Sequence, residues 1–177
     1  MPADDLRNDI AGHVDQLRRY ALALTRNPDE AADLVQDTLL RAIDGASGFA
    51  AGGDLRKWLF AILHNGWVSN RRRAAVRLAG DALARPALAE PAGQAEHVFL
   101  TQTLAALSRL PDEQRAAVVL VAVDGIGYRD AADILGVPVG TLMSRLARGR
   151  QALRDAVAGV PAEGDLPSGV PHLRVVR

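Results

Sequence analysis

The side chains with the clearest chemical potential lie near the C-terminal end, in the stretch YRDAADILGVPVGTLMSRLARGRQALR from Tyr128 to Arg154. A helix turns by about 100° per residue, so a helix over the second half of this stretch would gather its leucines on one side. The opposite side and its flanks would be small, polar and basic, with Thr141, Met143, Ser144, Ala147, Arg148 and Gln151. Arginine pairs with guanine edges or phosphate, and glutamine pairs with adenine. This face is therefore predicted to fit the major groove of DNA.

The element that must position this face is a pair of helices joined by a tight turn. We expect one helix over Tyr128–Leu135 and a second over 138–158, with Gly136 in the turn between them. Small residues fall where the two helices must cross, and this spacing predicts a helix-turn-helix. Arg145 lies at the edge of the buried side, where we expect it to pair with an acidic neighbour. A generic helical hairpin with a solvated basic face is the alternative.

A second group of residues combines cations with aromatic rings. It comprises Phe49, Arg56, Lys57, Trp58, Phe60, Trp67, Arg71, Arg72 and Arg73. Rings stack on unpaired bases while cations follow phosphates, so the pattern suits single-stranded nucleic acid. Phe49 stands alone in a glycine-rich loop and is expected to be exposed. Asn65 is polar in a largely apolar helix and could contact an unstacked base. Trp58 shares its helical register with Leu55 and Leu59 and is expected in the core, whereas Trp67 fits either place.

Helical periodicity dominates the first 75 residues. Apolar residues spaced by three or four predict helices over about 9–25 and 55–73, with a third between them. Asn27 is expected to cap this middle helix, Pro28 suits its first position, and the helix should end at Asp44. Residues 45–53 are rich in glycine and are expected to form a loop.

The remaining chain divides into a linker, a second helical unit and a tail. The domains expected are 1–75, a flexible linker over 76–96, a second domain over 97–158, and a tail rich in proline and glycine over 159–177. The run AAVVLVAV has the composition of a buried strand. We expect a helix there, because no partner strand exists elsewhere. The predicted fold class is all-α, with two small helical domains.

Composition narrows the classes of function. The chain has 177 residues and no cysteine, which excludes disulfides, a cysteine nucleophile and a thiolate zinc site. The four histidines are scattered without metal-ligand spacing, and no phosphate-binding loop or activated serine is evident, so neither metal, cofactor nor enzymatic activity is expected. No apolar run is long enough for a membrane helix and no signal core is present, so a cytoplasmic protein without membrane insertion is expected.

The net charge is zero, but the charges lie in blocks. Residues 41–85 contain eight basic and three acidic side chains, whereas residues 86–137 contain three basic and seven acidic ones. Residues 1–40 are also acidic, and residues 138–158 are basic. Ordinary solvated helix faces would explain the blocks. The alternative that we favour is two surfaces for polyanions, with the acidic faces turned to other partners.

Four motifs, in this order and at these separations, resemble the extracytoplasmic-function (ECF) sigma factors of bacterial RNA polymerase. They are DLVQDTLLRA at 33–42, LRKWLFAI at 55–62, LSRLP at 107–111 and GTLMSRL at 140–146. The resemblance covers residues 10–75 and 97–156. It implies two helical domains, named region 2 and region 4, and a function in directing core polymerase to promoters.

The resemblance also implies roles for individual residues. Region 2 would bind the clamp helices of the β′ subunit through Asp33, Gln36, Asp37 and Arg41. It would capture a flipped base of the promoter −10 element with the loop around Phe49, contact the base upstream with Asn65, and meet phosphates with Arg71, Arg72 and Arg73. Region 4 would bind the β flap and contact the −35 element with Met143, Ser144, Ala147 and Arg148. An anti-sigma factor is implied as a further partner, and a stress or envelope response as the regulon.

Rival functions explain less of the sequence. An autonomous helix-turn-helix regulator would account for residues 128–154 but would leave the motif at 33–42 and the aromatic basic helix without a role. A protein that mimics a sigma factor to sequester its inhibitor should lack the basic face, yet Arg148 and Arg71 are present.

Overall fold

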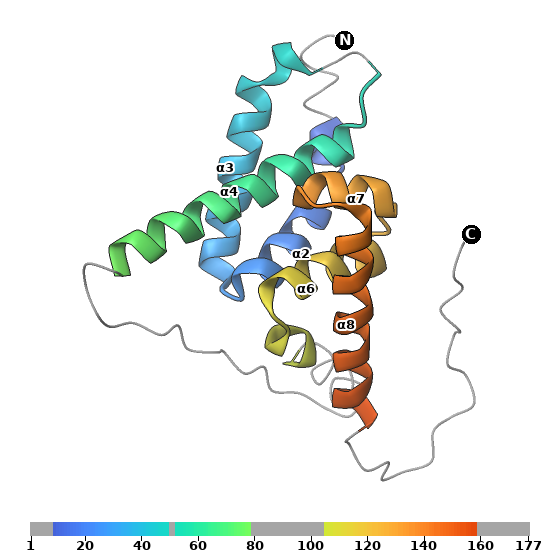
Figure 1. Cartoon of the computed structure of the whole chain (residues 1–177). Coiled ribbons are helices and arrows are strands. Elements are labelled where there is room, and N and C mark those ends of the chain that lie inside the picture. The colour runs from blue at the N-terminus through green and yellow to red at the C-terminus, as the bar shows by residue number, and fades with distance from the viewer. Residues whose placement is uncertain (1–8, 50–51, 79–104, 159–177) are drawn as a thin grey trace, which may run out of the picture.

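The computed structural model describes residues 9–49, 52–78 and 105–158, and every regular element within these residues is helical. The described residues form an N-terminal unit (residues 9–78) and a C-terminal unit (residues 105–158), as Figure 1 shows. The all-α class is therefore confirmed. The predicted linker, from residue 79 onward, and the predicted tail lie outside the described residues.

The N-terminal unit contains three long helices, α2 (Val14–Thr25), α3 (Pro28–Asp44) and α4 (Leu55–Leu78), together with a helical segment at residues 9–11. The predicted glycine-rich loop after α3 includes one 3-10 turn, η1 (Ala46–Gly48). Asn27 caps α3 as predicted, because its side-chain oxygen accepts hydrogen bonds from the backbone N–H groups of Asp29 (2.9 Å) and Glu30 (3.3 Å). The helix predicted from residue 9 is interrupted by a turn at residues 12–13, so α2 begins only at Val14.

The helix α4 is longer than predicted. The sequence predicts an end near Arg73, but α4 continues through Leu78 and so runs into the expected linker. The added residues, AAVRL, include alanine, leucine and arginine, whose high intrinsic helix propensity favours continuation of the helix. The apolar spacing changes after Arg73, and for this reason the sequence prediction ended the helix too early.

The C-terminal unit contains a helical segment over residues 105–109, then α6 (Asp112–Val118), the π-helical segment η2 (Val119–Val123), α7 (Tyr128–Leu135) and α8 (Val139–Ala158). The valine-rich run is helical, as predicted, and it widens into a π-helix before the chain turns at Gly125. Both ends of α7 and the start of α8 fall within one residue of the predicted bounds.

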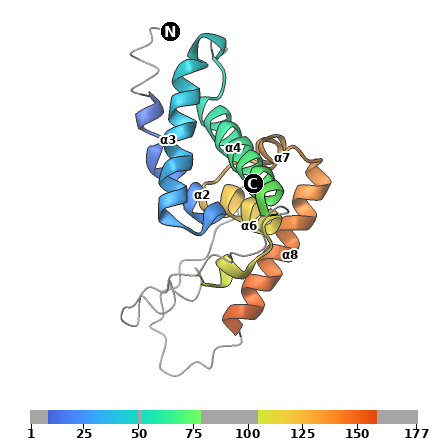
Figure 2. The ribbon, with the colours of Figure 1, turned by 90° about the vertical axis from the view of Figure 1, so that its left-hand side faces the viewer.

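The two units pack directly on each other. In both views α7 lies beside α4 (Figure 1, Figure 2), and α2 contacts α6 at a second point. Buried apolar residues of the two units belong to one continuous cluster, from Leu17 and Phe60 in the first to Leu120 and Ile134 in the second. The sequence predicts two tethered bodies, and it contains no local signal for this contact.

Candidate nucleic-acid interface

The helix-turn-helix is confirmed, and its turn depends on Gly136. This residue ends α7 with φ 64°, a left-handed conformation that glycine adopts without steric cost. Its N–H donates to the carbonyl of Asp133 (3.1 Å), and the N–H of Val137 donates to the carbonyl of Ala132 (3.0 Å). These bonds satisfy the last carbonyls of α7. The chain can therefore reverse at once and begin α8 in a fixed orientation.

The inner side of α8 is set by close packing against α6. Leu142 is fully buried and Leu146 nearly so. Gly149 is buried where the two helices cross, and a Cβ atom there would lie 2.7 Å from Cγ2 of Val118. The helices therefore approach more closely than any larger residue permits, and this contact fixes the rotation of α8 about its axis.

That rotation turns the predicted DNA-contacting face to solvent. Met143 is 53% exposed, and Ser144, Ala147, Arg148 and Gln151 are exposed as well, with Thr141 half-buried at the margin. The hydrogen bonds of this face stay within α8, since Arg148 donates from Nε to the carbonyl of Ser144 (3.3 Å). The six predicted residues thus form one continuous surface, which no other helix of the described structure covers.

The second predicted surface lies on the C-terminal half of α4. Asn65, Arg71, Arg72 and Arg73 are all exposed. The guanidinium of Arg71 lies 5.2 Å from the centre of the Trp67 ring, in a cation–π contact. Trp67 itself is 8% exposed and belongs to the core, which settles the ambiguity left by the sequence.

The environment of Phe49 differs from the prediction. The expectation that this ring is exposed and has nothing to pack against is wrong. Its centroid lies 4.9 Å from that of Trp58, and both rings are half-buried. Trp58 is therefore less buried than expected, because it forms the platform on which the loop rests. The two rings together present one aromatic edge beside the loop.

A third surface lies on α3. Asp33, Gln36, Asp37 and Arg41 are exposed. Asp33 and Gln36 lie on the side opposite the buried positions of α3, whereas Asp37 and Arg41 lie at its margin. Two apolar side chains share the solvent-facing side, namely Leu40 (54% exposed) and Ile43 (41% exposed). The sequence analysis did not single out this pair. The sequence nevertheless indicates their exposure, because both residues fall outside the helical register of the buried residues of α3.

Ion pairs accompany the apolar packing between the units. Lys57 on α4 binds two carboxylates of α7, with Nζ 2.8 Å from Asp130 Oδ1 and 2.6 Å from Asp133 Oδ2. These two hydrogen bonds raise the pKa of Lys57. Arg19 on α2 lies 3.4 Å from the buried carboxylate of Asp124, and burial raises the pKa of that carboxyl group.

A cluster around Asp112 forms the other part of this contact. Arg26 and Arg71 of the N-terminal unit and Arg115 of the C-terminal unit all pair with its carboxylate. Arg115 is 1% exposed, and burial lowers its pKa. It also donates to the carbonyls of Leu110 (2.7 Å) and, across the interface, Leu24 (3.3 Å). Arg115 was not predicted to be buried, because nothing local in the sequence distinguishes a buried arginine from a solvated one.

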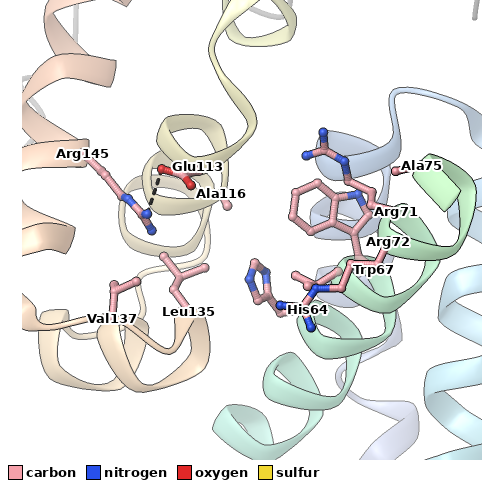
Figure 3. Close-up of a pocket in the computed structure, with 11 residues that line it drawn as sticks. His64, Trp67, Arg71, Arg72, Ala75, Glu113, Ala116, Leu135, Val137 and Arg145 are labelled. Atoms are coloured by element: carbon pink, nitrogen blue, oxygen red, sulfur yellow. Dashed lines mark ion pairs between the residues drawn. The ribbon is translucent and has the colours of Figure 1, made fainter. Parts of the chain in front are cut away.

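A cavity of about 410 Å³ remains between the units, as Figure 3 shows. His64 and Trp67 of α4 face Leu135 and Val137 across it, and Arg145 closes one side. Arg145 pairs with Glu113 at 2.7 Å, which confirms its predicted bracing role. Burial, with a smaller contribution from the charge of Arg145, lowers the pKa of His64 to about 4.

Two further features limit the chemistry of the described residues. Among them, no group of three or more histidine, cysteine, aspartate or glutamate side chains could hold a metal ion. None of their helices is both long enough and apolar enough to cross a membrane.

Comparisons with known proteins match each of the two helical units separately. Residues 10–64 match the model of the Sigma2 domain of PhyR, and residues 100–153 match the model of sigma-70 region 4. The ECF RNA polymerase sigma factor EcfG of Rhodopseudomonas palustris is 43% identical over 152 residues, which cover 85% of this chain and 83% of that protein. SigE of Mycolicibacterium smegmatis, also an ECF sigma factor, is 36% identical over 84% of this chain and 60% of its own length.

Solved structures give the same result. The sigma factor RpoE from Bartonella quintana, in complex with the anti-sigma factor NepR, superposes with a TM-score of 0.77 at 32% identity, covering 88% of this chain and 98% of RpoE. CnrH in complex with the cytosolic domain of CnrY superposes with a TM-score of 0.63 at 25% identity, covering 86% of this chain and 87% of that chain.

Proposed function

The chain belongs to the ECF sigma factors of bacterial RNA polymerase, and we propose that it directs the core enzyme to promoters through three separate surfaces. The N-terminal unit corresponds to region 2 and the C-terminal unit to region 4. The function follows from the family, and the assignment of surfaces to partners is our proposal. The family consists of transcription regulators rather than catalysts, and we place its action in the cytoplasm, where polymerase works.

The observation that carries the assignment is the exposed face of α8. A helix that projects Ser144, Ala147 and Arg148 into solvent from a rigid turn has the geometry that major-groove recognition requires. We propose that this face, with Thr141, Met143 and Gln151, contacts the −35 element. Small side chains near Arg148 leave room for the helix to lie close to base edges.

We propose that α4 and the loop before it recognise the −10 element. Arg71, Arg72 and Arg73 would meet phosphates and Asn65 an unstacked base. The edge formed by Phe49 and Trp58 would stack a second base, at about 1–3 kcal/mol per base. A helix-turn-helix alone cannot open a duplex. Stacking of captured bases supplies a free energy that opposes reclosure of the duplex.

We propose that α3 binds the core enzyme. Asp33, Gln36, Asp37 and Arg41 surround the exposed apolar side chains of Leu40 and Ile43. An apolar centre with a charged rim is the usual composition of a protein–protein contact. An autonomous regulator would leave this surface, and the surface of α4, without a partner. That alternative is not favoured.

The partners in the solved relatives suggest a further partner for this chain. RpoE is described in complex with the anti-sigma factor NepR, and CnrH in complex with the cytosolic domain of CnrY. We propose that a protein of the anti-sigma class binds this chain too. Co-purification with proteins encoded beside it tests this point, and the failure of every such protein to form a stable complex would contradict it.

Run-off transcription with core polymerase on random promoter fragments tests the function and returns the promoter motif. Arg148→Ala should reduce dependence on the −35 element, because a bidentate contact from arginine to a base is worth about 1–3 kcal/mol. Arg109→Ala, at an exposed arginine of the C-terminal unit that lies outside α8, is the matched control. If both variants lose dependence on the −35 element equally, the assignment of the exposed face of α8 to that element is wrong.

The −10 assignment has its own pair of variants. Phe49→Ala should impair promoter opening and leave binding to duplex DNA nearly intact, as measured by permanganate reactivity beside gel-shift titration. Phe49→Leu keeps an apolar contact with Trp58 but removes the stacking ring, so it should impair opening to a similar degree. Normal opening by Phe49→Leu would show that the residue only supports the loop.

A further inference from the structure

We propose that the cavity shown in Figure 3 is a binding site for a small aromatic carboxylate. Its volume of about 410 Å³ falls within the range of about 300–1,000 Å³ that is usual for pockets that bind small molecules. Its walls come from α4 on one side and from α6, α7 and α8 on the other. The site goes beyond the proposed function, because neither polymerase nor promoter is needed to form it.

The interior of the cavity suits a flat apolar group. Trp67 lines it from α4, and Leu135 and Val137 face this ring from the helix-turn-helix (Figure 3). The rings of Trp67 and His64 have centroids 5.5 Å apart and are inclined by 47°, so they form an angled aromatic wall. A third ring beside this wall can meet one ring with its face and the other with its edge, which are the arrangements that aromatic groups favour. An aromatic ligand therefore fits the wall better than an aliphatic one.

His64 supplies a directed hydrogen-bond donor. Its Nδ1 lies 3.0 Å from the hydroxyl group of the buried Tyr20, which makes no other hydrogen bond with the described residues. The hydroxyl proton is satisfied when Tyr20 donates it to Nδ1, and the single proton of the neutral ring then lies on Nε2. Burial lowers the pKa of His64 to about 4, so the ring is neutral near pH 7. The Nε2–H group, on the far side of the ring from Tyr20, is left to donate to a ligand in the cavity that His64 lines.

Cations around the cavity supply the charge that a carboxylate requires. Three arginines line it, namely Arg71, Arg72 and Arg145, against the one carboxylate of Glu113. Arg71 already pairs with Asp112, so the excess of positive charge lies on the other two arginines. A planar guanidinium group forms charge-assisted and often bidentate hydrogen bonds with a carboxylate. The lining therefore favours a carboxylate over a neutral polar group.

Arg145 is the best placed of these cations. Its side chain is 18% exposed, so water screens its charge less than the charge of a surface arginine. It binds Glu113 through Nη2 at 2.7 Å, and a guanidinium group has five N–H donors, so further donors remain for a second carboxylate. The charge of Arg145 contributes to the lowered pKa of His64, which shows that the two groups act on the same space. A carboxylate between them would receive hydrogen bonds from both, with its ring against Trp67.

Three probes separate the contribution of the ring from that of the charge. β-Naphthoate should bind the full-length protein with a dissociation constant below about 1 mM, as its size permits. The alcohol β-naphthylmethanol has the same ring without the charge and should bind at least about tenfold more weakly, because it loses a charge-assisted hydrogen bond. Acetate has the charge without the ring and should not bind measurably under the same conditions. Isothermal titration calorimetry measures all three affinities.

The two tryptophans of the chain report where the probe binds. A proton–nitrogen NMR spectrum contains one indole signal from each of them. β-Naphthoate should shift the signal of Trp67, which lines the cavity, and leave the signal of Trp58 unchanged. The variant Trp58→Phe assigns the two signals. Equal shifts of both signals would show adsorption to apolar surface in general and would overturn the proposal.

Variants of the lining residues test the roles of the charges. Arg145→Gln should weaken the binding of β-naphthoate at least about tenfold, because it removes the charged donor and keeps a side chain of similar length. Arg109→Gln makes the same change at an exposed arginine outside the cavity and should bind like wild type. Glu113→Gln removes the carboxylate that competes for Arg145 and should tighten binding severalfold. Adsorption without a specific site predicts neither the loss nor the gain.

A variant that fills the cavity keeps the test decisive if Arg145→Gln proves unstable. Val68 lines the cavity from α4, and Val68→Phe would place a ring there while leaving His64 and Arg145 in position. This variant should not bind β-naphthoate. Unchanged binding by Val68→Phe, equal affinities of Arg145→Gln and Arg109→Gln, or no binding by the wild-type chain at millimolar concentrations would each overturn the proposal. A chain that binds β-naphthoate but fails in run-off transcription would retain the site and contradict only the proposed function.

Discussion

Replacement of Gly149 tests the packing that aims the recognition helix. A Cβ atom at this position would come within 2.7 Å of Cγ2 of Val118, closer than real Cβ contacts allow. Val118 is 4% exposed and β-branched, so it has few alternative rotamers with which to yield. Overpacking of this kind costs about 1–3 kcal/mol. Alanine recovers about 0.5–1 kcal/mol of it through better helix propensity. Gly149→Ala should therefore lower the free energy of unfolding by up to about 2 kcal/mol.

Gly140 provides the control within the same helix. A Cβ atom there would meet nothing within 4 Å, so Gly140→Ala should be neutral or stabilising by up to about 1 kcal/mol. Urea unfolding followed by circular dichroism should separate the two midpoints by roughly 0.5–1.5 M, given slopes of about 2 kcal/mol/M. If Gly149→Ala unfolds at the same urea concentration as Gly140→Ala or above it, α8 does not approach α6 as described.

Three further predictions concern stability. The pKa of His64 is lowered to about 4 by burial, so the unfolded chain takes up a proton first as the pH falls. Stability is thus complete above pH about 6.5 and declines towards pH 4, by about 3 kcal/mol at most, and His64→Gln should flatten this part of a pH–unfolding profile. Asn27→Ala removes the cap of α3 and should cost about 1 kcal/mol in urea unfolding, whereas Asn27→Asp should cost much less. Arg115→Met leaves the carbonyl of Leu110 without its donor and removes the most deeply buried of the three arginines that pair with Asp112, so it should cost about 3 kcal/mol; a melting temperature equal to that of wild type would contradict the buried network.

The local elements of the fold were predictable from sequence because their causes are local. Asn27 caps α3 through N–H groups two and three residues away. Gly136 ends α7 because its own backbone must adopt φ 64°. The outward face of α8 follows from the helical period and from the inward leucines. Such features depend on residues within one or two turns, which the sequence displays directly.

The environment of individual aromatic and charged residues was less predictable. Phe49 was expected in solvent, yet it rests on Trp58, since the direction in which a loop folds back depends on what lies beside it. The place of Trp67 was undecided until the neighbouring helices were known. Arg115 and Asp124 are buried charges whose partners come from distant segments, and no periodicity identifies them.

The sequence by itself determined the family, the helical class and the helix-turn-helix, and it predicted the exposed face of α8, because side-chain type and helical spacing are local properties. Only the tertiary structure decided how the two units meet. Lys57 finds Asp130, and Arg71 finds Asp112, across separations that no local pattern encodes. Attraction between opposite charges depends on distance in space, and that distance is fixed only once helices far apart in the chain have packed together.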